Sequence, residues 1–311
     1  MRGEFLVAEL LQTPWALRRE VLASHVQVLA RWISGGQTGR SPLAMEDEGP
    51  AGQGISVFEA RRRDANARVG GNIAVIPVYG TIVQRAGMMT EWCGGSACSQ
   101  ISAALREAMA DETVSQILME FDSPGGSVYG VDELAAEIRE ARKSKTIVGF
   151  ANSLSASASY YLQSQCSEVY VTPGGEAGSI GVWMAHEDYT KAMEEYGVKT
   201  TIISAGKYKV EGNPYEPLSE EARAFMQKRV DEYYQAFVSA VAKGRGCGVD
   251  AVRTQMGEGR VLGAQDCKAC GMVDDVMPMQ DVIAKMRRAS SPTGRSPRQK
   301  AAARQREIEA L

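Results

Sequence analysis

From residue 72 onwards, short β-branched apolar runs alternate with stretches whose apolar residues recur every three or four positions. This alternation limits the possible folds more than any other feature of the chain. It predicts right-handed βαβ units and a mainly parallel sheet covered by helices, which is an α/β fold. The predicted strands are 72–83, 114–126, 146–152, 168–173 and 199–206, and the predicted helices are 99–112, 130–144, 155–165 and 219–246.

The segments on either side of this region have different sequence patterns. Residues 1–35 have apolar positions at helical spacing, interrupted near Pro14, and predict an N-terminal amphipathic helical segment. Residues 36–70 are rich in glycine, proline and charge and predict a flexible linker. The α/β domain then spans 71–286. Residues 287–311 carry seven basic and two acidic residues and predict a disordered basic tail.

Composition excludes several classes of protein. The chain has 311 residues, of which 44% are hydrophobic and 23% charged, as in an ordinary soluble protein with a sizeable core. A net charge of −3 predicts no general attraction to nucleic acid or to a membrane surface. No apolar run is long enough to span a bilayer, and the N-terminus does not have the pattern of a signal peptide. We therefore expect the chain to stay in the cytoplasm of the cell that makes it.

The six cysteines invite a metal or disulfide interpretation. Cys267 and Cys270 are the only close pair, and no second pair completes a tetrahedral zinc site. Without a secretory signal, free buried thiols are the expected state. We expect neither a metal nor a cofactor.

The stretch "ANSLSASASYYLQSQC", residues 151–166, places serines at every second position before two tyrosines. Strict alternation is typical of a strand, whereas small residues followed by bulky ones are typical of the start of a buried helix. A serine nucleophile would need a base and donors for the oxyanion. The chain has only two histidines. His25 lies outside the α/β region, and His186 has no evident reason to face the serines.

Lysine is the alternative base, and it must be neutral, which requires burial in an apolar pocket. Lys207 and Lys209 follow the predicted strand 199–206, at the sheet edge where a site is expected, although lysines in a loop are more often solvated. The turn "DSPGGS", residues 122–127, also follows a strand. The backbone N–H groups of Gly125 and Gly126 could serve an oxyanion, cradle a phosphate or simply form a turn.

Four motifs in this order resemble the signal peptide peptidase A (protease IV) family, whose members are Ser–Lys peptidases on the ClpP/crotonase fold. The motifs are "FDSPGGSVYG", "ASASYYLQS", "GSIGVWMAHEDY" and "SAGKYKVEGNPYEPLS", and the resemblance covers roughly residues 72–280. It implies a ClpP/crotonase-like fold, Ser157 as nucleophile with Ser155 as the fallback, and Lys209 as base, with Lys207 an exposed neighbour.

The resemblance also implies supporting residues. Ser179 matches a serine that orients the lysine amine, and the N–H groups of Gly126 and Ala158 match the oxyanion donors, with Gly125 as the alternative. The family has glycines where this chain has Ala158 and Ser159. In bacterial relatives the serine and the lysine come from adjacent protomers of a ring, so we expect a homo-oligomer with shared active sites.

The flanking sequences resemble a phage branch of the family, the head proteases related to the minor capsid protein C of lambdoid phages. This implies a serine endopeptidase of prohead maturation that cleaves portal, scaffold or itself, working in the host cytoplasm or within the prohead. Three alternatives stay open: a soluble peptidase for signal peptides or protein quality control, a crotonase-type acyl-CoA enzyme, and a non-catalytic structural component of the capsid.

Overall fold

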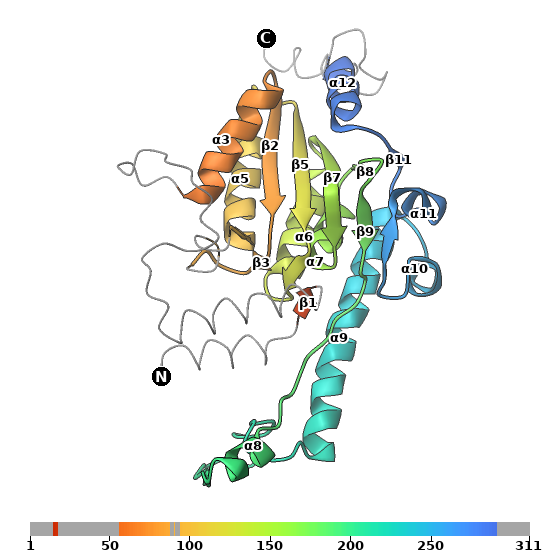
Figure 1. The fold of residues 1–311 in the computed structure, drawn as a ribbon. Helices are drawn as coiled ribbons and strands as arrows, with labels where there is room; N and C mark the ends of the chain where they lie inside the picture. Colours follow the sequence, from red (N-terminus) through yellow and green to blue (C-terminus); the bar gives the residue numbers. More distant parts are fainter. Residues whose placement is uncertain (1–14, 18–55, 88–89, 91–93, 291–311) are drawn as a thin grey trace.

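The predicted α/β architecture is confirmed by a computed structural model, which describes residues 15–17, 56–87, 90 and 94–290. A twisted, mostly parallel sheet lies between helices on its two faces, and one long helix extends well beyond the sheet (Figure 1). The N-terminal segment and the basic tail lie almost entirely outside the described residues.

Three long parallel strands form one side of the main sheet, with β2 at its edge. They are β2 (Ile73–Tyr79), β5 (Gln116–Ser123) and β7 (Thr146–Ala156), in the order β2-β5-β7. β8 (Glu168–Val171) and then β9 (Glu176–Gly178) pair parallel with successive parts of β7. β11 (Asp275–Val276) pairs with β8, and β10 (Val261–Gly263) is antiparallel to β9. Because these three long strands are parallel, their carboxyl ends lie at the same end of the sheet.

The sheet is apolar on both faces because each face is covered by helices. On β5, Ile117, Met119 and Phe121 pack into a core shared with α5 (Cys98–Ala110), α6 (Val131–Ala141) and α7 (Ala158–Gln163). Leu118 points to the opposite face, into a second core with α3 (Val57–Val69) and α12 (Met279–Ser290). The period of two along a strand thus divides the side chains between two cores.

A second, four-stranded sheet lies beside the carboxyl edge of the main sheet. Its order is β1-β6-β3-β4, formed by β1 (Trp15–Leu17), β6 (Gly125–Ser127), β3 (Ile82–Val83) and β4 (Ser96–Ala97). β6 follows β5 after the single residue Pro124, so the glycine turn leads directly from one sheet into the other. β3 lies parallel to β6 on one side, and β1 lies antiparallel to it on the other.

The prediction of a flexible linker up to residue 70 is wrong for its last part, which is helix α3. The Ser56 side chain caps this helix, and Phe58 and Val69 are buried against the sheet. Asn66 then fixes the helix to β2 by accepting from the Val75 N–H (2.9 Å) and donating to the Val75 carbonyl (3.1 Å). Few apolar positions anchor α3, and its exposed arginines hide them in the sequence. Of the predicted N-terminal helical segment, only Trp15–Leu17 is described, and it is a strand.

The prediction of a strand over 199–206 is also wrong. These residues have no regular structure and none of them is buried. They belong to a projecting segment, residues 184–230, which we call the arm. It contains α8 (Thr190–Glu195) and the first turns of α9 (Glu220–Arg245), and both lie far from the sheet in Figure 1. A β-branched run forms a strand only where a partner strand is available, and the arm offers none.

The predicted long helix is confirmed as α9, with Ser219 as its cap. α10 (Val249–Gln255) and α11 (Ala264–Ala269) follow it, and α12 then runs to Ser290. The first residues of the predicted tail are therefore helical, and the Arg287 side chain donates to the Val69 carbonyl. None of the helices in the described part of the chain is long and apolar enough to cross a membrane.

Candidate active site

The serine run combines a strand and a helix, which explains why its sequence fits both patterns. β7 extends to Ala156, and α7 begins at Ala158, so Ser157 is the single residue at the junction. Ser155, the fallback nucleophile, is a buried strand residue whose hydroxyl bonds that of Ser159 at 3.0 Å. That bond occupies the Ser155 hydroxyl in a local structural role.

Ser157 has a backbone conformation that is unusual for a residue with a side chain. Its φ is 57° and its ψ is −120°. Two hydrogen bonds hold this conformation: the Ser157 N–H donates to the Gly178 carbonyl at 2.7 Å, and the Ser157 carbonyl accepts from the Tyr161 N–H at 2.9 Å. Strained backbone of this kind clusters at functional sites, and a serine on a sharp strand-to-helix turn is a known arrangement of hydrolase nucleophiles.

The hydroxyl of Ser157 is enclosed and uncommitted. The residue is 1% exposed, and its Oγ forms no hydrogen bond with another residue of the described part of the chain. The helix behind it is firmly anchored: the Tyr161 hydroxyl donates to Asp132 at 2.7 Å, and the Tyr160 hydroxyl donates to the Met272 carbonyl at 2.9 Å. Burial raises the pKa of Tyr161, and the hydrogen bond to Asp132 raises it further, so this phenol stays protonated.

Ser179 lies next to Ser157 at the same edge of the sheet. β7 and β9 pair in parallel with Ala156 opposite Gly178, so each serine is the first residue beyond a paired position. Ser179 also has a positive φ, 54°, and its N–H donates to the Arg260 carbonyl at 2.7 Å. The structure thus brings together two serines that are distant in the sequence.

We call the junction of β7 and α7, residues 155–161, the serine elbow, or elbow for short. The glycine turn lies on the side of the elbow opposite Ser179. Ser123 pairs with Ser155, so Gly125 and Ser157 each lie two residues beyond the last paired position, and β6 packs against α7. The Gly125 N–H donates to Ser123 Oγ at 3.2 Å, which commits that amide to the turn. Gly126 runs so close to β3 that a Cβ would lie 1.8 Å from the Ile82 carbonyl oxygen. Ala158 opens α7, where amide groups have no partner within the helix.

Lys209, the predicted base, lies on the arm and is exposed. Its neighbour Lys207 forms an ion pair with Glu221 at 3.1 Å, near the start of α9. The elbow contacts the same helix sixteen residues later, where the rings of Tyr161 and Phe237 are 4.7 Å apart. At 1.5 Å per residue, these two contacts are about 24 Å apart along the helix. A lysine side chain cannot bridge that distance, so Ser157 and Lys209 of one chain do not meet.

The other candidate bases are not at the elbow either. His186 lies on the arm, where its Nε2 bonds the Asn213 carbonyl at 3.1 Å, and His25 is outside the described residues. On the α/β domain, Lys145 donates to two carbonyls at the end of α5 and Lys285 pairs with Glu168. Within the described ranges, these histidine and lysine side chains bond to groups away from the elbow, which itself offers a hydroxyl and backbone amides.

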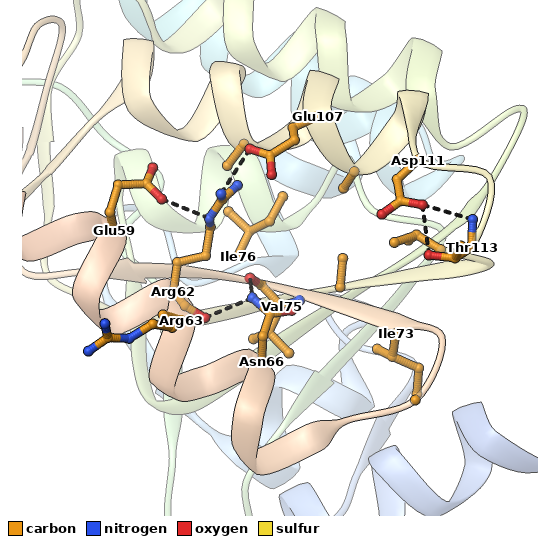
Figure 2. A pocket seen from close by; sticks show the side chains of 15 residues that line it. Glu59, Arg62, Arg63, Asn66, Ile73, Val75, Ile76, Glu107, Asp111 and Thr113 are labelled. Atoms are coloured by element: carbon orange, nitrogen blue, oxygen red, sulfur yellow. Dashed lines mark hydrogen bonds and ion pairs between the residues drawn. The ribbon is translucent and has the colours of Figure 1, made fainter. Parts of the chain in front are cut away.

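A hollow between α3, β2 and α5 lies on another part of the domain (Figure 2). Arg62 crosses it and pairs with Glu59 (3.1 Å) and Glu107 (2.8 Å), and Asp111 accepts from Thr113. Arg62 and the two glutamates of the hollow thus neutralise one another, and the residues that line it include no member of the serine elbow. Of the cysteines in the described ranges, Cys98, Cys166 and Cys267 are buried free thiols, as the sequence predicts, whereas Cys247 and Cys270 are half-buried.

Sequence reasoning missed two backbone groups that shape the elbow, the carbonyls of Gly178 and Arg260. Gly178 has a φ of 126°, and a Cβ there would lie 2.7 Å from the Arg260 carbonyl oxygen. The first glycine of "AGSIG" could have indicated them in the sequence, because glycine suits both a positive φ and a close backbone approach.

Comparisons with known proteins found a family domain and several relatives. Residues 139–291 match Peptidase family S49. The chain is 36% identical over 271 residues to the Head-tail preconnector protein GP5 of Enterobacteria phage P21, covering 87% of this chain and 52% of that protein. It is 35% identical over 247 residues to the Capsid assembly protease C of Escherichia phage lambda, covering 79% and 53%.

A bacterial relative is more distant: Protease 4 of Salmonella typhi is 28% identical over 220 residues, which cover 70% of this chain and 35% of that protein. The chain thus spans about half the length of the two phage relatives. The matched region contains the elbow, the arm and the helices that follow them. Residues 139–291 therefore form a Peptidase family S49 domain.

Proposed function

We propose that the chain is a serine endopeptidase in which Ser157 is the nucleophile and Lys209 of a second copy is the base. The observation that carries this proposal is the elbow: an enclosed, uncommitted serine with a positive φ at the junction of β7 and α7. The position of Lys209 on the arm supports the second part, because a base that cannot reach its own Ser157 can serve the Ser157 of a neighbour.

The proposed reaction has two stages. The neutral amine of Lys209 takes the Ser157 proton as Oγ attacks a peptide carbonyl, and the N–H groups of Gly126 and Ala158 stabilise the oxyanion. The protonated amine then gives its proton to the leaving amine. In the second stage Lys209 takes a proton from water, the resulting hydroxide attacks the ester, and Ser157 recovers its proton as the acid product leaves.

Docking of the arm would also create the surroundings that such a base needs. Burial against apolar surfaces favours the neutral form of an amine over the ammonium ion. On the free arm the lysine is exposed, and large apolar side chains elsewhere on the arm are exposed too: Tyr208, Tyr215 and Phe225. We assign to Ser179, which lies beside Ser157, the hydrogen bond that orients the incoming amine; the pairing of β7 with β9 supports this.

Mixing two inactive variants tests the shared site. Ser157→Ala and Lys209→Ala chains are each expected to be inert against an unfolded protein substrate. When they are denatured together and refolded at equal amounts, random assembly gives sites that combine an intact serine with an intact lysine, and about a quarter of wild-type activity returns. If the dyad formed within one chain, every site would lack one member and the mixture would stay inert.

For substrates, we propose capsid-related proteins of a phage: portal, scaffold or the protease itself, cut during prohead assembly in the host cytoplasm. The two phage relatives, one of them named a capsid assembly protease, support this. Co-expression with the portal and scaffold genes of the same phage, followed by intact mass analysis, tests it. Cleavage of unfolded proteins but of neither capsid candidate would favour the quality-control alternative.

A further inference from the structure

Strand β6 is held on both sides, and its two partners differ in origin. β3, which follows β2 after two residues, takes one side in parallel. β1 takes the other side, antiparallel, with Trp15 opposite Ser127, Ala16 opposite Gly126 and Leu17 opposite Gly125. Without β1, β6 would be an edge strand with free N–H and C=O groups. Such an edge is a template on which an extended peptide can pair.

The edge that β1 occupies runs beside the serine elbow. β6 packs against α7, whose first residue follows Ser157. A peptide paired with β6 therefore passes next to Ser157. Ala16 lies opposite Gly126, the residue whose amide we assign to the oxyanion. The backbone of β1 thus lies where a substrate backbone would have to lie.

The state of Ser157 fits an occupied site. Its 1% exposure leaves no open approach for a peptide carbonyl, which must come within about 3–3.5 Å of Oγ for attack. Only three residues of β1 pair with β6, and a short two-stranded pairing contributes little stability by itself. The covering strand is therefore held weakly enough to be displaced.

We propose that β1 is an internal occupant of the peptide-binding edge of β6, which inhibits the enzyme until a substrate displaces it. The occupant is the backbone of residues 15–17, and the ligand it excludes is an extended peptide that pairs antiparallel with β6. This inference rests on the proposed function for the identity of the site, although the occupancy can be measured without catalysis.

Peptide binding by the full chain carrying Ser157→Ala tests the proposal. The probe is a fluorescent peptide of residues 11–21, followed by anisotropy. The test variant adds Ala16→Pro and Leu17→Pro. Adjacent N–H groups of a strand point to opposite sides, so one of these prolines removes the N–H that faces β6. The control variant carries Ala51→Pro and Gly52→Pro in the glycine-rich stretch.

We expect the test variant to bind the probe about tenfold or more tightly than the parent and the control, because a tethered competitor has been removed. A probe with the same two prolines should not bind. Hydrogen exchange of residues 125–127 should become faster in the unliganded test variant, and this checks the pairing directly. Equal affinities, with equal exchange in the three folded chains, would overturn the proposal.

The outcomes separate this inference from the proposed function. If the test variant binds the probe more tightly but the protein with an intact Ser157 cleaves no substrate, β1 occupies the edge of β6 and the proposed peptidase activity is wrong. If cleavage depends on Ser157 and Lys209 but the two prolines change neither probe affinity nor hydrogen exchange, the peptidase activity is supported and the occupancy of β6 by β1 is wrong.

Discussion

The elbow and the arm are built on opposite principles, although we propose that they form one active centre. Around the elbow, Ser157, Tyr160 and Tyr161 are buried, and hydrogen bonds fix their backbone or hydroxyl groups. On the arm, Ile203 is 94% exposed and Tyr196 is 83% exposed. The elbow is therefore shaped by the packing of its own chain, whereas the arm presents apolar surface that only another molecule can cover.

The largest expected effect comes from the elbow. Ser157→Ala should lower kcat/KM by about 10⁴-fold or more, because the nucleophile is lost while the fold is kept. Ser155→Ala is the matched control. It removes the 3.0 Å bond to Ser159, so it should cost about 1 kcal/mol of unfolding free energy but keep activity within a few fold. Loss of activity in the control alone would make Ser155 the nucleophile.

On the arm, Lys209→Ala should lower kcat by about 10³-fold with no change in Tm, because an exposed side chain contributes little to stability. Lys207→Ala, two residues away, removes a surface ion pair with Glu221 and should change activity by less than about threefold. Kinetics and thermal unfolding of both variants distinguish the base from its neighbour. Equal losses in the two would contradict our assignment.

The exposed apolar residues of the arm should matter for assembly rather than for folding. Ile203→Ser combined with Tyr196→Ser should lower the oligomer mass in light scattering and reduce activity by about 10- to 100-fold, since the shared sites would come apart. Thermal unfolding of the α/β domain should stay within about 2 °C of wild type. An intact oligomer with full activity would show that the arm does not mediate assembly.

Ser179 allows the roles of a hydroxyl and of a strained backbone to be separated. Ser179→Ala keeps the positive φ and loses the hydroxyl, so activity should fall about tenfold with little change in stability. Ser179→Gly loses the same hydroxyl but relieves the strain, and it should raise the unfolding free energy by about 1 kcal/mol. If both variants keep wild-type activity, the hydroxyl does not orient the amine.

Much of the α/β domain could be predicted because its sequence patterns and its packing agree. The continuous apolar runs that become β2, β5 and β7 are buried on both faces, and the helical spacing of α5, α6 and α9 matches their contacts. The prediction of a strand over 199–206 failed because pattern and packing disagree there. Its β-branched residues have strand propensity, but the chain provides no neighbouring strand.

The elbow could be located from sequence but not constructed. Small residues in "ASASYY" and the glycines of the turn indicate close backbone approach, yet only the register of β7 with β9 places Ser179 beside Ser157. Because pairing between distant strands depends on the whole sheet, no local pattern contains it. The pairing of β1 with β6 is a further case, since more than a hundred residues separate the two strands.

The smallest expected effect is a pH dependence of stability that arises from a buried thiol in the core behind the elbow, where the chain is closed to solvent, unlike the arm. Burial raises the pKa of the Cys166 thiol from its ordinary value near 9 to about 12, so the folded chain keeps a proton that the unfolded chain releases above pH 9. The free energy of unfolding therefore falls as the pH rises from 9 towards 12, by about 1 to 2 kcal/mol at pH 10. Urea unfolding of wild type and Cys166→Ala at pH 8 and pH 10 measures this difference. The stability advantage of wild type over Cys166→Ala should narrow at the higher pH, and an unchanged gap would mean that the core around α7 admits water as the arm does.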